Sequence, residues 1–90
     1  MRIWIKEIRD CKPVRDTVIE DLRDDTRTHK IYDALDKACV EFDLGTPIWL
    51  EKNIQEFKRS ARTKFYADSF IETIDFDYLE LAVLEEDSIW

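Results

Sequence analysis

Residues 57–65 form the segment of this sequence whose composition most suggests a chemical role. The segment reads FKRSARTKF, and it contains four cations and no carboxylate. Lysine and arginine side chains without counter-ions bind anions, either phosphate groups or the carboxylates of an acidic protein surface. The segment therefore predicts a surface that binds an anion or an acidic partner.

A helix that runs from Leu50 would gather this charge on one side. At 100° per residue, several polar side chains fall within about 80° of one another, opposite Leu50, Ile54 and Phe57. This polar face consists of Lys52, Gln55, Arg59 and Arg62. With the neighbouring lysines added, the predicted partner- or anion-binding residues are Lys52, Gln55, Lys58, Arg59, Arg62 and Lys64.

Charge is divided unevenly along the chain. Residues 1–50 carry 9 basic and 11 acidic side chains (net −2), residues 51–64 carry 5 and 2 (+3), and residues 65–90 carry 0 and 8 (−8). Regions of opposite charge can pair between two copies of a chain or with another protein. We therefore predict a non-catalytic domain that acts by protein–protein interaction or self-association.

Two other interpretations of the basic segment stay open. The cations could neutralise the acidic C-terminal quarter within the fold, or simply lie in water. Alternatively, the helix face could bind nucleic acid or a nucleotide phosphate, because two helices joined by a glycine-containing turn loosely resemble a helix-turn-helix. The net charge of −7 counts against nucleic acid.

The sequence predicts no enzyme, no cofactor and no metal site. His29 and Cys39 cannot form a catalytic dyad, since ten residues along one helix separate them by about 15 Å. We expect His29 to pair with Asp33 one turn later, and Cys39 to be a small packed thiol.

Three carboxylates near the end of the chain resemble a cation site. Asp75 and Asp77 would point to the same side of a strand, with Glu80 close by. The glycine and the third ligand of a calcium loop are missing, so we expect these residues to line the outer face or edge of the last strand, where charge discourages aggregation.

Length and composition predict one small cytoplasmic domain, covering residues 1–90. The chain has no apolar run of the roughly 20 residues that a membrane helix needs, and no apolar leader precedes its first charges. Cys11 and Cys39 stand far apart without a CxxC motif, which favours two free thiols in a reducing compartment. We therefore expect neither export nor contact with a membrane.

The hydrophobic pattern predicts a β-hairpin followed by a helix. RIWIKEI (residues 2–8) and residues 14–22 are rich in β-branched residues and are separated by the turn-forming RDCKP. Residues 26–43 then place apolar side chains at helical spacing, with Asp24, Asp25 or Thr26 as the cap and Gly45 as the end.

A second helix and a final strand complete the predicted fold. The helix begins either at Thr46-Pro47 or near Glu51, after an extended PIWL, and ends around Arg62. The strand spans residues 74–85. The elements make an α+β domain of order ββααβ, with an antiparallel sheet of three or four strands and two helices packed on one face. The predicted core of the helix layer is Leu35, Phe42, Ile54 and Phe57.

The segments DTRTHKIYDALDKACVEFDLGTPIWLEKNIQEFKRSARTKF and DSFIETIDFDYLE together resemble small hypothetical proteins of clostridia and related Firmicutes. The resemblance covers nearly the whole chain. It implies a free-standing bacterial cytosolic domain and assigns no catalytic or binding residue.

Overall fold

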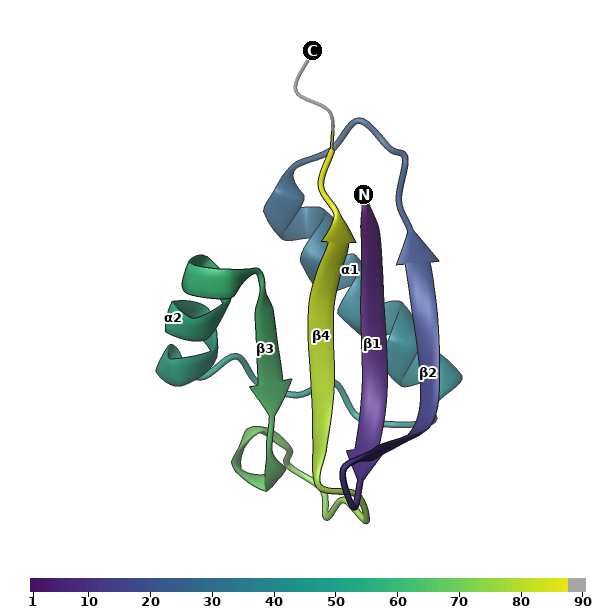
Figure 1. Cartoon of the computed structure of the whole chain (residues 1–90), viewed down its shortest axis with the longest axis vertical. Helices are drawn as coiled ribbons and strands as arrows, with labels where there is room; N and C mark the ends of the chain where they lie inside the picture. The colour runs from purple at the N-terminus through teal and green to yellow at the C-terminus, as the bar shows by residue number, and fades with distance from the viewer. Residues whose placement is uncertain (88–90) are drawn as a thin grey trace.

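Strands β1 (Arg2–Arg9) and β2 (Lys12–Glu20) form the predicted hairpin in the computed structural model, which describes residues 1–87 (Figure 1). Asp10 and Cys11 make the turn, both with positive φ (53° and 64°), as the tight turns that match strand twist require. Pro13 lies within β2 and not in the turn, at a register shift opposite Ile8. A proline is tolerated there because β2 is an edge strand.

The sheet has the strand order β2-β1-β4-β3, and every neighbouring pair is antiparallel. β4 (Tyr78–Glu85) is a central strand. It starts at Tyr78, whereas the sequence predicted a start at residue 74. Asp75 and Asp77 therefore precede the strand, where Asp77 accepts a hydrogen bond from the Asp10 backbone N–H at 2.9 Å. Of the three carboxylates predicted to line β4, only Glu80 lies on it.

Helix α1 (Arg27–Glu41) crosses one face of the sheet (Figure 1). Thr26 caps its start, because its hydroxyl accepts the backbone N–H of His29 at 3.2 Å. The predicted end at Gly45 is wrong. Asp43 takes the left-handed conformation (φ 56°) just after the helix, and the N–H of Leu44 returns to the Cys39 carbonyl at 2.8 Å.

Helix α2 (Glu51–Ser60) begins at Glu51 and not at Thr46-Pro47, the other start that the sequence left open, and Pro47 to Leu50 are outside any helix. The helix also stops sooner than predicted. Ala61 adopts a left-handed conformation (φ 56°, ψ 31°), and the chain turns back into β3 (Arg62–Phe65). A short 3₁₀ helix, η1 (Ala67–Ser69), follows.

The α+β class is confirmed, with four strands in the sheet and the element order ββααββ. The core lies between the sheet and the helices. It is formed by inward side chains of β1, β3, β4 and α1, among them Ile3, Ile5, Phe65, Leu79, Leu81, Leu35 and Phe42. Leu35 and Phe42 are buried as predicted, whereas Ile54 and Phe57 of α2 are only half-buried.

Candidate functional site

The six predicted binding residues divide between two elements. Lys52, Gln55, Lys58 and Arg59 lie on α2, as expected, but Arg62 and Lys64 lie on β3. The helical placement of Arg62 is wrong, because α2 ends at Ser60 and Ala61 adopts a left-handed conformation from which β3 begins. In the structure, Thr63 and Phe65 are buried and alternate with Arg62 and Lys64, the period-two pattern of a strand.

Two of the six residues, Lys52 and Gln55, contact another polar side chain of the molecule, and a third, Lys64, places its ammonium group over the Tyr78 ring at 4.9 Å. Lys52 makes an ion pair with Asp68 of η1 at 2.6 Å and lies over the Tyr66 ring. The Gln55 amide donates to Glu51 one turn earlier at 2.8 Å. Lys52 and Gln55 are therefore less available to a partner than the sequence suggested.

The remaining four residues are Lys58, Arg59, Arg62 and Lys64, which we call the basic cluster. Within residues 1–87, none of them makes an ion pair. Four of the acidic residues after position 70 pair with other cations instead: Asp75 with Arg9, Glu80 with Lys6, Glu86 with Arg27 and Asp87 with Lys30. Internal neutralisation by the acidic quarter therefore applies to Lys52, which pairs with Asp68, and to no member of the basic cluster within residues 1–87.

Three members of the basic cluster meet in a shallow cleft of about 250 Å³ at the junction of α2 and β3. The cleft is lined by Glu56, Arg59, Ser60, Arg62, Thr63, Lys64 and Glu80. Three cations and two carboxylates give it a formal charge of +1. Both carboxylates already have partners: Glu56 accepts the Lys64 backbone N–H at 3.0 Å, and Glu80 pairs with Lys6 at 3.3 Å.

The side chain of Asn53 connects α2 to β3, the two elements that carry the basic cluster. It is 1% exposed, and its amide makes three hydrogen bonds. The oxygen accepts the Leu50 N–H at 3.0 Å, and the nitrogen donates to the Thr63 hydroxyl and the Lys64 carbonyl, both at 2.9 Å. Asn53 and Glu56 therefore satisfy the outward backbone groups of Lys64 on edge strand β3. The sequence did not predict this role, and its only indication is that Asn53 is next to the apolar residue Ile54.

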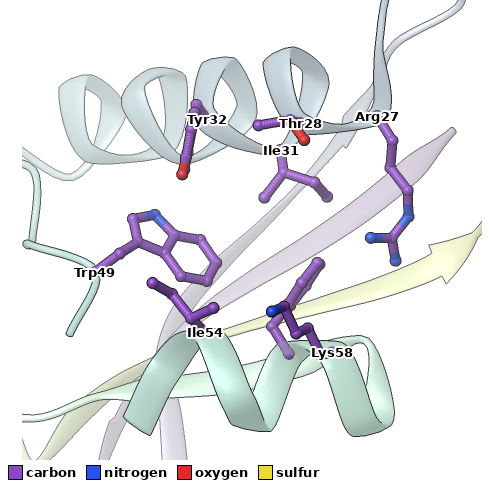
Figure 2. Close-up of a pocket in the computed structure, with 8 residues that line it drawn as sticks. Arg27, Thr28, Ile31, Tyr32, Trp49, Ile54 and Lys58 are labelled. Atoms are coloured by element: carbon purple, nitrogen blue, oxygen red, sulfur yellow. The ribbon is translucent and has the colours of Figure 1, made fainter. Parts of the chain in front are cut away.

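A second concave feature, the interhelical groove, lies between α1 and α2 (Figure 2). Its volume is about 270 Å³, and its lining residues are Arg27, Thr28, Ile31, Tyr32, Trp49, Ile54, Phe57 and Lys58. Trp49 lies between the helices and makes edge-to-face contacts with Tyr32, Phe57 and Phe65 at ring-centroid distances of 5.8, 5.5 and 5.0 Å. The groove explains why Ile54 and Phe57 are only half-buried.

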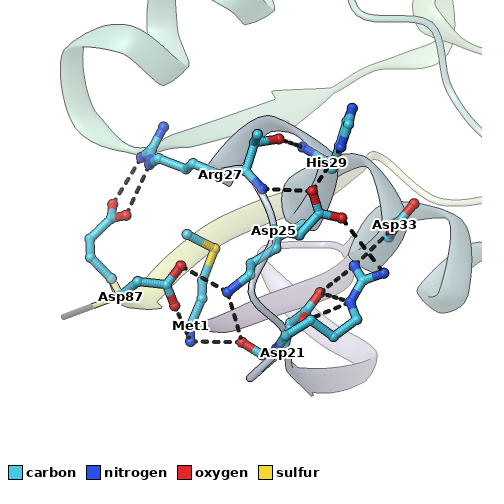
Figure 3. Close-up of polar contacts among 11 residues, drawn as sticks. Met1, Asp21, Asp25, Arg27, His29, Asp33 and Asp87 are labelled. Atoms are coloured by element: carbon cyan, nitrogen blue, oxygen red, sulfur yellow. Dashed lines mark hydrogen bonds and ion pairs between the residues drawn. The ribbon is translucent and has the colours of Figure 1, made fainter. Parts of the chain in front are cut away.

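The region around the start of α1 has the opposite character to the basic cluster (Figure 3). Arg23 contacts Asp21 at 2.7 Å and Asp33 at 2.8 Å, and Arg27 makes a bidentate contact with Glu86. The hydrogen bonds from Arg23 hold the pKa of Asp21 well below its ordinary value of 3.8. Each of these cations is thus matched by a carboxylate.

Lys30 extends this network inward. The lysine is 3% exposed, and its ammonium group meets Asp87 at 2.9 Å. Asp87 also accepts the Met1 amino group at 2.8 Å. Hydrogen bonds from these two ammonium groups lower the pKa of Asp87.

The only histidine of the chain belongs to the same network, although not with the predicted partner. The exposed His29 ring meets Asp25 at 2.9 Å, whereas Asp33 pairs with Arg23. Hydrogen bonding to His29 lowers the pKa of Asp25.

Both cysteines are free thiols, as predicted. Cys39 is buried in the core, and burial raises its pKa to about 11, so that it stays protonated at neutral pH. Cys11 is exposed in the hairpin turn.

Two further findings concern metals and membranes. Residues 1–87 contain no group of three or more histidine, cysteine, aspartate or glutamate side chains placed to hold a metal ion. Over the same residues, no helix has the length and apolar character needed to cross a membrane.

The basic cluster and the interhelical groove are therefore two features of residues 1–87 that could receive a partner. The resemblance to small clostridial proteins stays a prediction. Comparisons with protein-family models, with curated proteins and with solved structures give no match to this chain.

Proposed function

We propose that this protein is a non-catalytic binding domain that recognises an acidic segment of a protein partner through its basic cluster. The observation that carries the proposal is the contrast in ion pairing. Seven of the fourteen lysine and arginine side chains contact a carboxylate in the described chain, and the three unpaired ones outside the cluster, Arg2, Lys12 and Lys37, lie on three different elements. The basic cluster, by contrast, gathers four cations without ion pairs in seven residues, and three of the four line one cleft.

The arrangement of the cluster suits a segment that carries several carboxylates. Arg59 comes from the last turn of α2 and Arg62 from the start of β3, so that both residues line one cleft. Arginine binds carboxylates in a bidentate geometry, which adds direction to the charge attraction. The two carboxylates of the cleft are already engaged and leave the cations to an external anion.

A protein partner is favoured over nucleic acid by charge. The molecule as a whole carries −7, which repels a polyanion at long range. A short acidic segment presents fewer charges and can contact the cluster locally, where screening by salt shortens the reach of the remaining repulsion.

The test is a titration with a defined acidic probe, a short labelled peptide of glutamates around a central alanine, followed by fluorescence anisotropy. The double variant Arg59→Glu/Arg62→Glu should weaken peptide binding by about tenfold or more, since like charges would face each other. Lys12→Glu/Lys37→Glu is the matched control. It changes the net charge identically, from −7 to −11, at exposed lysines outside the cluster.

The control variant should bind the peptide nearly as well as the unmodified protein. Equal weakening by both variants would mean that only net charge matters, and would overturn the proposal. Binding of a short single-stranded DNA more tightly than the peptide, with a steep dependence on salt, would favour the nucleic-acid alternative instead.

A further inference from the structure

The interhelical groove lies directly beside the basic cluster, and the two features share one residue. Lys58 belongs to the cluster and also lines the groove. Figure 2 shows the Lys58 ammonium group and the Arg27 guanidinium group directed toward the space between α1 and α2. A partner segment bound at the cluster would therefore pass the mouth of the groove.

The interior of the groove is apolar and aromatic. Ile31 and Tyr32 of α1 face Ile54 and Phe57 of α2, with Trp49 between the helices. Phe57 is half-buried and Tyr32 is 46% exposed, although both contact the Trp49 ring edge-to-face. Of the two cations that line the groove, Arg27 is paired with Glu86 and Lys58 has no ion pair within residues 1–87. Aromatic surface that is left partly open next to such a cation is typical of the anchor pocket of a protein interface.

The size of the groove indicates what it can hold. Its volume of about 270 Å³ lies below the range of roughly 300–1,000 Å³ in which free small molecules are usually enclosed. Arg27, Thr28 and Lys58 at its rim are exposed, so a small molecule would stay partly in water. A single large apolar side chain, delivered by a longer segment that is held by charge outside, suits these dimensions better.

A buried polar atom beside the groove also favours a peptide. The indole nitrogen of Trp49 is buried and finds no hydrogen-bond acceptor within residues 1–87. Figure 2 shows this nitrogen on the edge of the ring that faces α1. Buried donors are normally paired, and a backbone carbonyl that enters with an apolar side chain would supply the acceptor after a small rotation of the ring.

We propose that the interhelical groove receives one bulky apolar side chain of the acidic partner segment, so that the partner motif is a large apolar residue flanked by carboxylates. This inference rests on the proposed function. Charge at the basic cluster, including Lys58 at the groove, sets the orientation of the segment, and burial of the apolar residue against Trp49 and Phe57 supplies most of the affinity.

Two peptides test the inference, namely the glutamate peptide with central alanine and the same peptide with phenylalanine in its place. Burial of the ring should make the phenylalanine peptide bind about ten- to a hundredfold more tightly. Thr28→Phe, which fills the groove from α1, should abolish this advantage. Val40→Phe is the matched control, because it adds the same ring at an exposed α1 position outside the groove and should preserve the advantage.

Nuclear magnetic resonance of the unmodified protein gives a second readout that does not depend on a variant folding. The Trp49 indole N–H signal should shift with the phenylalanine peptide and not with the alanine peptide. Equal affinity of the two peptides for the unmodified protein would overturn the inference. An indole N–H signal that shifts with neither peptide would also overturn it.

The outcomes separate the two proposals. If Arg59→Glu/Arg62→Glu weakens both peptides while they bind the unmodified protein equally, the groove inference fails and the proposed function stands. If the double variant leaves the alanine peptide unaffected, the proposed function fails, whatever the phenylalanine peptide does.

Discussion

The start of α1 and the end of α2 differ sharply in the ion pairing of their cations. Around the start of α1, Arg23, Arg27 and Lys30 each contact at least one carboxylate, and the acids come from the residue after β2, from α1 and from the two residues after β4 (Figure 3). At the end of α2, Lys58 and Arg59 make no ion pair within residues 1–87. The difference teaches that net charge alone does not assign a role to a basic residue.

Ion pairing around α1 ties together segments that are distant in sequence. Arg27 and Glu86 are 59 residues apart, and Lys30 and Asp87 are 57 apart. These pairs join α1 to the residues that follow β4. The basic cluster makes no such pair within residues 1–87. We therefore expect substitutions around the start of α1 to change stability, and substitutions in the basic cluster to change peptide binding.

The largest expected effects are losses of unfolding free energy in the core, which we compare between the side covered by α1 and the side covered by α2. Phe42→Ala should cost about 3–5 kcal/mol of unfolding free energy, because its ring is 3% exposed and is covered by Arg15. Phe57→Ala should cost less, about 1–3 kcal/mol, since its ring already borders the groove. Urea denaturation measures both. Equal losses would show that the groove is closed in solution.

Asn53→Ala comes next, with an expected loss of about 3 kcal/mol, because three hydrogen bonds disappear and buried backbone groups lose their partners. The loss should be accompanied by faster amide hydrogen exchange at Leu50, whose N–H loses the Asn53 oxygen as its acceptor. Asn53→Asp is the closest control, as it keeps the acceptor for Leu50 and removes the donor to Thr63 and Lys64. Unchanged exchange at Leu50 in Asn53→Ala would contradict the bridging role.

Acid titration should separate the two charged regions. Hydrogen bonding lowers the pKa values of Asp21, Asp25, Glu86 and Asp87 below their ordinary 3.8 and 4.5. A carboxyl whose pKa is lowered in the folded state stabilises the fold above its unfolded pKa, and that contribution is lost as the pH falls through the folded value. The thermal midpoint should therefore fall steadily below about pH 4.5.

Arg23→Gln should flatten this fall, because Asp21 loses the side chain that lowers its pKa. The variant and the unmodified protein should differ at pH 7 and converge as the pH approaches 2. Arg59→Glu/Arg62→Glu should keep the acid-induced fall. Parallel curves for Arg23→Gln and the unmodified protein would mean that the pair contributes nothing to pH dependence.

The smallest expected effect is that of the basic cluster on stability. Arg59→Glu and Arg62→Glu should each change the unfolding free energy by only about 0.5 kcal/mol, as exposed substitutions away from the core usually do. Denaturation of the double variant measures the sum. A large loss of stability with undiminished peptide binding would identify the cluster as a structural counterweight to nearby acids and not as a binding surface.

Local pattern was sufficient for a large part of this fold. The β-branched composition of residues 2–8 predicted β1, helical spacing of apolar residues within residues 26–43 predicted α1, and the strand pattern of residues 74–85 predicted β4. In each case the pattern is strong because one face of the element is covered completely, so that burial acts on every turn or every second residue. The same reasoning placed Lys52 to Arg59 on a helix.

Tertiary structure decided the remainder, including the shape of the candidate site. Ala61 ends α2 because the chain must reverse to pair Thr63 with Leu81, a contact that no local propensity encodes. The partners of His29, Asn53 and Lys30 were equally hidden, since hydrogen bonds and ion pairs depend on which segments meet in space. The sequence by itself determined that a basic segment exists; only the fold decided which of its cations are left without partners in the described chain and that a groove opens beside them.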